Sequence, residues 1–197
     1  MPTDLIGVIL LAAGASTRLG KPKQLLRFQG ETLLRRNAKI ALAASKRVIV
    51  TLGSQIEILR KEIEDLPVEI IENKDWATGM SGSIKVGLKE FLNDADKAKA
   101  VIVMVCDQPF VNEKLLEKII TKFQETDSPI VACEYQNALG VPALFRKNLF
   151  PELLALDAQT GAKQLIKKYH ALAAAISFPE GAFDIDTPAD YENLIAS

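Results

Sequence analysis

The pattern that most constrains this chain is an alternation of short apolar runs with stretches of helical periodicity. Leu5–Leu11 and Ala100–Cys106 are almost continuously apolar, and each has the length of a buried strand. Continuously apolar strands that alternate with helices are typical of a parallel sheet covered by helices on both faces. The sequence therefore predicts an α/β fold, with a single-domain, doubly wound and mostly parallel sheet.

The remaining elements follow from the same periodicity. Further strands are predicted at Arg47–Leu52, Val68–Ile71 and Pro129–Cys133, and helices at Thr32–Ala44, Ile56–Glu64, Ser81–Phe91 and from the cap Asn112 to Phe123. After Glu134 the rhythm is less regular, with short strands at Pro142–Phe145 and Ala173–Ser177 and helices at Lys147–Leu156, at Thr160–Tyr169 and from near Pro188. No linker interrupts the series, so we expect one domain over residues 1–197.

Composition excludes several classes of protein. The 24 basic residues nearly balance the 25 acidic ones, and a net charge of -1 argues against nucleic acid as a partner. No apolar run approaches the roughly 20 residues of a membrane-spanning helix, and Met1–Ile6 lacks the basic region of a signal peptide. Cys106 and Cys133 are interpreted as buried reduced thiols, and a single histidine, His170, gives no support for a zinc site. We expect a cytoplasmic protein.

A loop of small and basic residues follows the first predicted strand, from Ala12 to Leu25. Ligands of doubly wound sheets bind at the carboxyl ends of the strands, where this loop begins. Its small residues allow close approach to a ligand, and successive backbone N–H groups can form an anion-binding nest. Arg18, Lys21 and Lys23 add three cations within six residues. The combination indicates a triphosphate site, and a basic surface loop is the alternative.

This loop matches neither of two common phosphate-binding motifs. A Walker A loop has four residues between its glycines, whereas Gly14 and Gly20 enclose five, and Pro22 stands where Ser or Thr would follow the lysine. Ala13-Gly14-Ala15 also lacks the G-x-G of the dinucleotide fingerprint. The sequence therefore predicts a phosphate loop of a different kind.

Acidic residues follow two other predicted elements. Asp107 directly follows the apolar run that ends at Cys106. A carboxylate at this position needs a compensating cation or hydrogen-bond donors. Mg²⁺ suits it, since this ion binds one or two carboxylates together with substrate phosphates; a cap for the helix near Asn112 is the alternative. Asp186 is a second candidate ligand, although Asp186 or Thr187 could instead cap the last helix.

Five segments together resemble the molybdopterin nucleotidyltransferases, the MobA-like branch of the nucleotide-diphospho transferase superfamily, and most closely its molybdenum cofactor cytidylyltransferases. These segments are Leu11–Lys23 (LAAGASTRLGKPK), Asn73–Leu88 (NKDWATGMSGSIKVGL), Cys106–Val111 (CDQPFV), Gly140–Phe145 (GVPALF) and Asp184–Tyr191 (DIDTPADY). The resemblance implies a Rossmann-like fold. It also implies an enzyme that transfers a nucleoside monophosphate to an acceptor phosphate and releases pyrophosphate.

The resemblance also implies roles for individual residues. Arg18, Lys23 and Asp107 would be catalytic: the two cations neutralise the triphosphate, with Lys21 as a possible helper, and Asp107 binds Mg²⁺ together with Asp186. The nucleotide would contact a set drawn from several segments, namely Leu11, Ala12, Ala13, Gly14, Arg18, Lys23, Gly79, Ser81, Ser83 and Asp107. Residues 1–110 would form the nucleotide-binding half and residues 111–197 the acceptor-binding half. Trp76, the only tryptophan, either stacks on a ligand or anchors its own loop.

The LAAG sequence resembles the cytidylyl-transferring branch, whereas guanylyl-transferring members typically have LAGG, so Ala13 favours CTP over GTP. Val141 and Ala158–Lys163 depart from the family pattern in the half that would hold the acceptor. We expect a phosphate group of molybdopterin to attack the α-phosphate of CTP, without a strong protein base because a phosphate monoester is largely ionised at pH 7. The alternatives are another phosphorylated acceptor, such as a sugar or polyol phosphate including methylerythritol phosphate, and a non-catalytic nucleotide sensor or cofactor-insertion partner.

Overall fold

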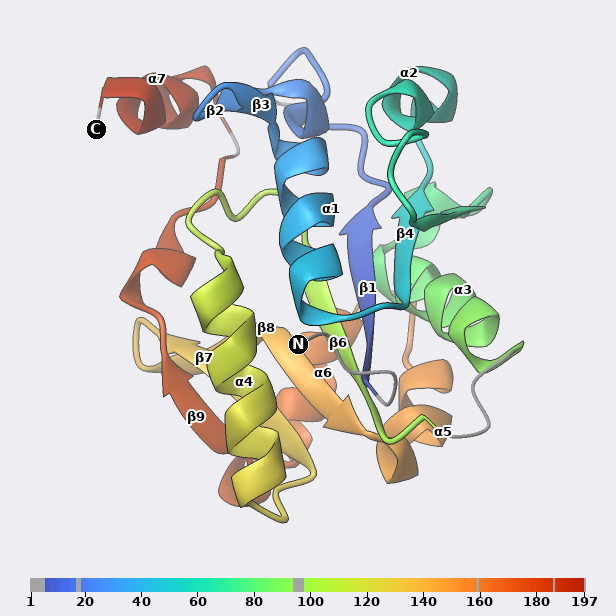
Figure 1. The fold of residues 1–197 in the computed structure, drawn as a ribbon, viewed down its shortest axis with the longest axis vertical. Helices are drawn as coiled ribbons and strands as arrows, with labels where there is room; N and C mark the ends of the chain where they lie inside the picture. Colours follow the sequence, from blue (N-terminus) through green and yellow to red (C-terminus); the bar gives the residue numbers. More distant parts are fainter. Residues whose placement is uncertain (1–5, 17–18, 94–97, 159, 186, 197) are drawn as a thin grey trace.

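The core of the fold is a seven-stranded sheet with strand order β5-β4-β1-β6-β8-β7-β9 (Figure 1). The computed structural model describes residues 6–16, 19–93, 98–158, 160–185 and 187–196. The sheet strands are β1 (Ile6–Ala12), β4 (Val48–Leu52), β5 (Glu69–Glu72), β6 (Ala100–Val105), β7 (Ile130–Tyr135), β8 (Ala138–Arg146) and β9 (Ala174–Ser177). Two short strands, β2 (Arg27–Phe28) and β3 (Glu31–Thr32), form a separate antiparallel hairpin.

The central strands are parallel, as their continuous apolar runs predict. β1 pairs in parallel with β4 on one side and with β6 on the other, and β4 pairs in parallel with β5. Every residue of β1, β4 and β6 is buried. Successive side chains of β1 enter opposite layers of the core: Val8 and Leu10 pack on one face and Ile9 on the other. The predicted doubly wound, mostly parallel fold is therefore confirmed.

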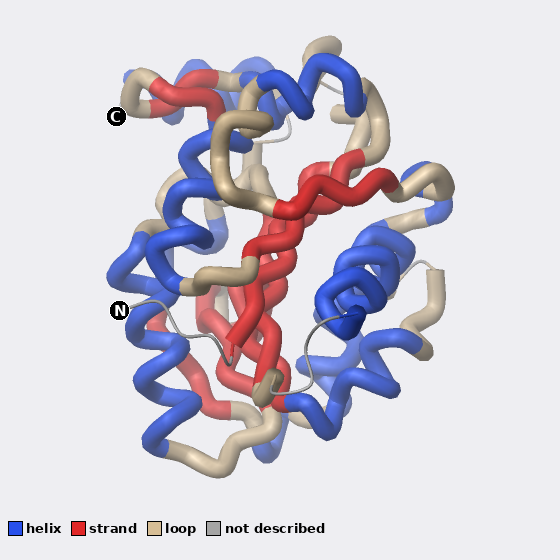
Figure 2. Tube along the Cα trace, turned by 45° about the vertical axis from the view of Figure 1, so that its right-hand side comes forward, coloured by secondary structure: helices blue, strands red, loops and turns tan. Residues whose placement is uncertain are grey.

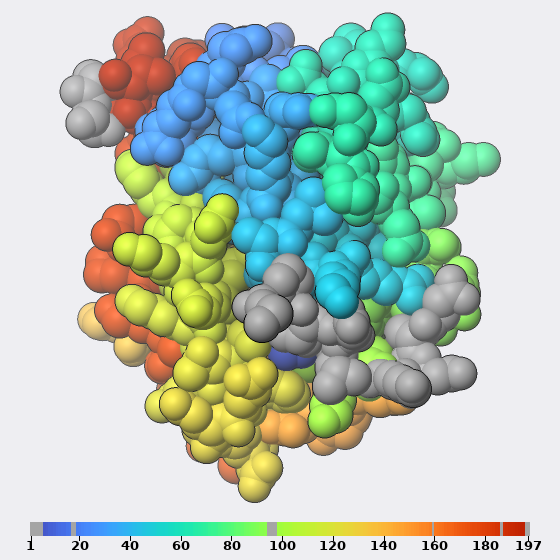
Figure 3. Space-filling model, viewed as in Figure 1, coloured from blue at the N-terminus to red at the C-terminus, as the bar shows by residue number. Residues whose placement is uncertain are grey.

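Helices cover both faces of this sheet (Figure 2). The helices are α1 (Leu33–Ala44), α2 (Ile56–Lys61), α3 (Met80–Asn93), α4 (Glu113–Glu125), α5 (Phe150–Leu154), α6 (Gly161–Lys168) and α7 (Pro188–Ala196). α1 and α4 pack against each other on one face, which Figure 3 views directly, and α3, α5 and α6 cover the other. None of the helices described is long and apolar enough to cross a bilayer.

Side-chain caps set the starts of α1 and α4, and the cap of α4, Asn112, is the one that the sequence predicts. The Thr32 hydroxyl accepts a hydrogen bond from the Arg35 N–H, and the Asn112 side chain accepts one from the Leu115 N–H at 3.0 Å. Asn112, rather than Asp107, therefore caps α4. At α7, the side chains of Thr187 and Asp190 each accept a hydrogen bond from the backbone N–H of the other residue, which is a capping box.

The sheet differs from the prediction after Glu134. The expected short strand Pro142–Phe145 is part of a longer strand, β8, which runs antiparallel to both β6 and β7. The β7–β8 turn has Gln136 and Asn137 at φ 51° and 58°, the left-handed pair typical of a tight hairpin. This turn contains no glycine, so its sequence gives only a weak hairpin signal. The predicted helix Lys147–Leu156 is shorter and is preceded by a 3₁₀ turn over Lys147–Leu149.

Candidate active site

A cavity of about 420 Å³ opens at the carboxyl ends of β1 and β6. β1 separates β4 from β6 in the sheet, so the connections after these strands leave a crevice where doubly wound folds bind ligands. The cavity is lined by Leu11, Ala12, Ala13, Gly14, Ala15, Ser16, Lys23, Gln24, Trp76, Ala77, Gly79, Met80, Ser83, Val105, Cys106 and Asp107. Its size suits a small organic ligand such as a nucleotide.

The loop after β1 is held in shape by the residues that follow it. The Gln24 amide group donates hydrogen bonds to the carbonyl oxygens of Ala12 (2.9 Å) and Gly14 (2.8 Å). The Ser16 hydroxyl accepts a hydrogen bond from the Lys23 N–H at 3.0 Å. Ser16 has φ 52°, an uncommon conformation for a residue with a side chain, and these contacts help to hold it. The loop therefore folds back on itself.

Three successive N–H groups of this loop are available for a ligand. The backbone N–H groups of Gly14, Ala15 and Ser16 donate to no acceptor among the described residues, and all three residues line the cavity. At position 14 a Cβ atom would meet no neighbour within 4 Å, so the backbone here is open to close approach. Consecutive unpaired N–H groups form the kind of nest that binds phosphate oxygens.

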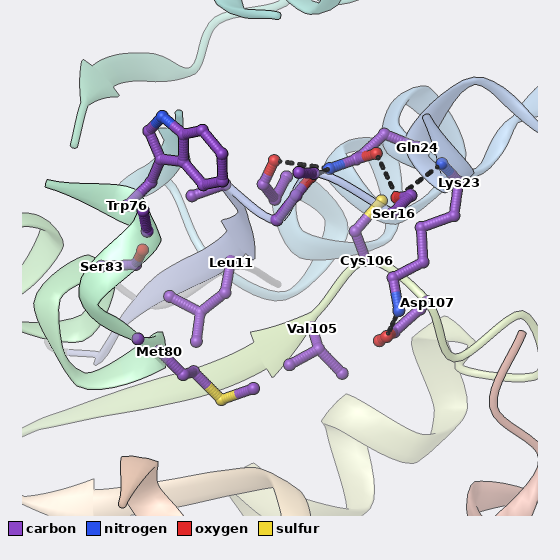
Figure 4. Close-up of a pocket in the computed structure, with 16 residues that line it drawn as sticks. Leu11, Ser16, Lys23, Gln24, Trp76, Met80, Ser83, Val105, Cys106 and Asp107 are labelled. Atoms are coloured by element: carbon purple, nitrogen blue, oxygen red, sulfur yellow. Dashed lines mark hydrogen bonds and ion pairs between the residues drawn. The ribbon is translucent and has the colours of Figure 1, made fainter. Parts of the chain in front are cut away.

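Lys23 and Asp107 bring opposite charges together at one end of the cavity. The Lys23 ammonium group forms an ion pair with the Asp107 carboxylate, and the two side chains are 20% and 21% exposed (Figure 4). Lys23 lies on a 3₁₀ turn (Lys23–Leu25), and Asp107 directly follows the end of β6 and Cys106. The ion pair thus joins the two loops that border the crevice, and it supplies the compensating cation that the sequence required for this carboxylate.

The carboxylate of Asp107 fits a metal that arrives with a polyphosphate. Among the described residues no cluster of three or more His, Cys, Asp or Glu side chains could hold an ion by itself. Mg²⁺, however, usually binds one or two carboxylates and takes its other ligands from water and substrate phosphates. Asp107 faces the same cavity as the N–H groups of the loop. The predicted second ligand, Asp186, lies outside the described residues.

The opposite end of the cavity is more apolar and includes Trp76 (Figure 4). Trp76 begins a short 3₁₀ turn and is partly exposed, and it packs over Gly53, where a Cβ atom would lie 2.5 Å from the Cβ of Trp76. The buried side chain of Asn73 holds this turn, since it donates to the Ser83 hydroxyl (3.0 Å) and accepts from the Asp75 N–H (3.1 Å). The structure is therefore compatible with both predicted roles of Trp76, because this residue packs against Gly53 and also lines the cavity.

Most predicted site residues lie around this one cavity. It is lined by eight of them, namely Leu11, Ala12, Ala13, Gly14, Lys23, Gly79, Ser83 and Asp107. Ser81 is buried outside this set, and its hydroxyl donates to the Ala158 carbonyl at 2.8 Å. Lys21 also lies outside it, with its ammonium group 5.1 Å from the centre of the Tyr191 ring. The remaining catalytic candidate, Arg18, is outside the described residues.

Several lining residues were not predicted from the sequence. Gln24, which is 2% exposed, and Ser16 both line the cavity. One indication for Gln24 in the sequence is its position directly after a predicted phosphate-binding lysine. A glutamine is usually an exposed residue, so its type alone gave no indication of burial.

The thiol of Cys106 lines the cavity but is not activated as a nucleophile. Burial raises its pKa well above the ordinary range, and the neighbouring Asp107 carboxylate raises it further, against a smaller opposite effect of Lys23. A thiol is nucleophilic as its thiolate. The structure therefore agrees with the prediction that Cys106 is a buried, reduced cysteine, and it is a free thiol.

The residue after Asp107 connects the cavity to the C-terminal part of the chain. Gln108 is 2% exposed, and its amide group donates to the carbonyls of Val141 and Gly181, both at 3.1 Å. Val141 belongs to β8, and Gly181 to the 3₁₀ turn Pro179–Ala182. The loop that carries Asp107 is therefore fixed to both of these segments.

Comparison with known proteins assigns most of the chain to one family. The family model described as MobA-like NTP transferase domain matches residues 8–173. Nicotine blue oxidoreductase of Paenarthrobacter nicotinovorans is 34% identical, with 98% of each chain covered. Molybdenum cofactor cytidylyltransferase of Escherichia coli K12 is 26% identical, over 94% of this chain and 93% of that protein.

A solved structure supports the same relationship. The Rv0371c protein of Mycobacterium tuberculosis H37Rv superimposes with a TM-score of 0.84 and 28% identity, over 98% of this chain and 99% of that chain. A structure of the same protein in complex with manganese has a TM-score of 0.78 and covers 99% of this chain and 100% of that chain. The likeness therefore extends over the sheet and both helical layers.

Proposed function

This chain is a nucleotidyltransferase that belongs to the MobA-like NTP transferase family, and from that premise we propose that it transfers CMP from CTP to the phosphate of molybdopterin. Pyrophosphate is the other product. The observation that carries the proposal is the cavity at the ends of β1 and β6, which combines the N–H groups of Gly14–Ser16, the Lys23–Asp107 ion pair and the ring of Trp76. A nucleoside triphosphate needs such a polar end and such a flat apolar end.

The orientation of the nucleotide follows from the two ends of the cavity. We assign the triphosphate to the end with Lys23 and the loop N–H groups, and the base to the end with Trp76. Arg18 is proposed to assist Lys23. The residues that line the cavity all precede Gln108, which supports assigning the nucleotide to residues 1–110 and the acceptor to residues 111–197.

CTP is preferred over GTP because of the wall near Ala13. Ala13 is 6% exposed and lines the cavity, and its carbonyl accepts a hydrogen bond from the Ser54 N–H at 3.1 Å. A methyl group at this position occupies room that a glycine would leave open, which favours the smaller pyrimidine base.

We propose Mg²⁺ as the metal, with Asp107 and Asp186 as its protein ligands. When bound, this ion would neutralise charge on the phosphates. The protein residues hold the α-phosphate in line with the acceptor and stabilise the charge of the departing pyrophosphate, which is the main form of catalysis in phosphoryl transfer. An ionised acceptor phosphate attacks the α-phosphorus, the bond to the β-phosphate oxygen breaks, and pyrophosphate leaves.

The experiment is a matrix of the four nucleoside triphosphates against phosphorylated acceptors, read by pyrophosphate release with and without Mg²⁺. The acceptors are molybdopterin, a sugar phosphate and methylerythritol phosphate. We expect release with CTP and molybdopterin only. Release with GTP would refute the argument from Ala13, and release with another acceptor would refute the molybdopterin assignment.

Two further outcomes would refute the transfer reaction itself. A nucleotide sensor or cofactor-insertion partner would bind CTP and release no pyrophosphate with any acceptor. Because a relative with 34% identity is named an oxidoreductase, oxidation of nicotinamide cofactors is followed in the same samples. Redox turnover without pyrophosphate release would contradict the proposal.

A further inference from the structure

Gln24 has a polar side chain in a position that is almost fully buried. It is 2% exposed, and its amide nitrogen donates to two carbonyls, of Ala12 at 2.9 Å and of Gly14 at 2.8 Å. These carbonyls belong to the last residue of β1 and to the loop that follows it. One side chain therefore uses both of its N–H bonds to fix the loop at two points.

These two hydrogen bonds determine which polar groups the loop presents to the cavity. A carbonyl oxygen near a phosphate would repel it, whereas an N–H group would attract it. The Gln24 amide engages the Ala12 and Gly14 carbonyls, and the N–H groups of Gly14, Ala15 and Ser16 donate to none of the described residues. The amide thus holds the loop with its N–H groups available for an anion.

The same turn also orients the cation of the site. Lys23 and Gln24 are adjacent on the 3₁₀ turn, and their side chains point in different directions, Lys23 toward Asp107 and Gln24 toward the loop (Figure 4). The Ser16 hydroxyl connects the two residues, since it accepts from the Lys23 N–H at 3.0 Å and lies 3.4 Å from the Gln24 side-chain oxygen, to which it donates. A change at Gln24 would therefore disturb both the N–H groups and the base of the Lys23 side chain.

We propose that Gln24 is a positioning residue that preorganises the loop after β1 for the β- and γ-phosphates of the nucleotide. This inference rests on the proposed function for the identity of the ligand. Gln24 acts through the backbone of Ala12–Ser16 and through Lys23, and it touches no reacting atom. A loop that is already ordered binds its anion without first losing conformational entropy.

The test replaces Gln24 by methionine, which has a similar length and no N–H donor. Gln124, exposed on α4, is replaced by methionine as the matched control. Binding of inorganic pyrophosphate at a fixed Mg²⁺ concentration is measured by calorimetry, because this probe requires neither the correct base nor the acceptor. For Gln24→Met we expect affinity to fall on the order of ten-fold, as the loss of two buried hydrogen bonds implies, and no change for Gln124→Met.

Steady-state kinetics separates positioning from a general loss of structure. Gln24→Met should raise the KM for the nucleoside triphosphate and leave the KM for the acceptor unchanged, whereas partial unfolding would lower kcat without this selectivity. If Gln24→Met does not fold, Ser16→Ala provides a milder variant, since it removes the hydroxyl that connects Lys23 and Gln24. It should weaken pyrophosphate binding by about two- to five-fold.

The outcomes distinguish this inference from the proposed function. Wild-type affinity for pyrophosphate in folded Gln24→Met, or in Ser16→Ala where the first variant does not fold, would overturn the role of Gln24. If the wild-type protein binds pyrophosphate, Gln24→Met weakens binding and no acceptor is modified, the phosphate-loop role stands and the transfer reaction is refuted. Failure of the wild-type protein to bind pyrophosphate would overturn both.

Discussion

The ammonium group of Lys23 forms an ion pair with the carboxylate of Asp107, which connects the loop after β1 to the loop after β6. Both groups are mostly shielded from solvent, so neither is solvated as a surface charge would be. A polyphosphate with its metal would offer each group a new partner, phosphate for Lys23 and the metal for Asp107. The pair therefore keeps two charged groups in place that the proposed reaction uses separately.

Replacement of Asp107 by asparagine should separate these two roles. We expect metal-dependent pyrophosphate release to fall by about 10²–10³, by analogy with the loss of one preorganised charge-stabilising group. Binding of CTP measured in EDTA should not weaken, because Lys23 loses a competing partner. Asp127→Asn, at an exposed position after α4, is the control and should keep wild-type turnover. Wild-type metal-dependent turnover in Asp107→Asn would show that Asp107 is not a metal ligand.

The single tryptophan gives a direct probe of the nucleotide. Because Trp76 lines the cavity and is partly exposed, CTP should change its fluorescence emission. Trp76→Leu should weaken CTP binding by about 5- to 150-fold, since stacking of a base on an aromatic ring contributes about 1–3 kcal/mol, and Trp76→Phe should weaken it less. Binding of inorganic pyrophosphate should be unchanged in both variants. Equal loss of pyrophosphate and CTP binding would instead indicate that Trp76 serves only as an anchor.

The fold could be predicted because its signals are local. β1 and β6 are more continuously apolar than a strand with one solvent-exposed face would be. Burial of both of their faces follows from that composition. β8 was incomplete in the prediction because its first part, Ala138–Val141, contains a glycine and is followed by Pro142, and both residue types are unusual inside a strand. Pairing with β7 extends the strand over Ala138–Gly140, although the sequence of this segment does not indicate it.

The site could be predicted only as separate residues. Lys23 and Asp107 were each identified by chemistry, but they are 84 positions apart and nothing in one sequence indicates that their side chains meet. Gln24 was not identified at all, because its role depends on hydrogen bonds to two backbone carbonyl groups. The type of a residue does not indicate which backbone groups its side chain contacts. The roles of the site residues remain predictions.

Gly53 should prove necessary for the wall that Trp76 forms. A Cβ atom at position 53 would lie 2.5 Å from the Cβ of Trp76 and 2.8 Å from the carbonyl oxygen of Ala13, so one of them must move. We expect Gly53→Ala to lower the free energy of unfolding by about 1–3 kcal/mol, as for other overpacked sites, and to weaken CTP binding.

The matched control for this prediction is Gly87→Ala in α3. A Cβ atom there would lie 2.7 Å from Ile9 and 2.9 Å from Thr51, in the core and outside the set of residues that line the cavity. It should destabilise the protein to a similar extent and leave CTP affinity of the folded protein unchanged. Equal CTP affinity in the two folded variants would contradict a specific role for Gly53 in the site.

The buried thiols should make the protein less stable at high pH. Burial raises the pKa of Cys133 from its ordinary value of 9.0 to about 12. Above pH 9 the unfolded chain therefore loses a proton that the folded chain retains, and the free energy of unfolding falls as the pH rises toward 12. For one thiol the slope approaches about 1.4 kcal/mol per pH unit.

The measurement is urea denaturation between pH 8 and 10.5. The free energy of unfolding should decline less steeply with pH for Cys133→Ala than for the wild-type protein. Lysines and tyrosines also titrate in this range, but they are common to both proteins, so the difference between the two slopes isolates the thiol. Parallel slopes would indicate that Cys133 ionises in the folded protein as readily as in the unfolded one.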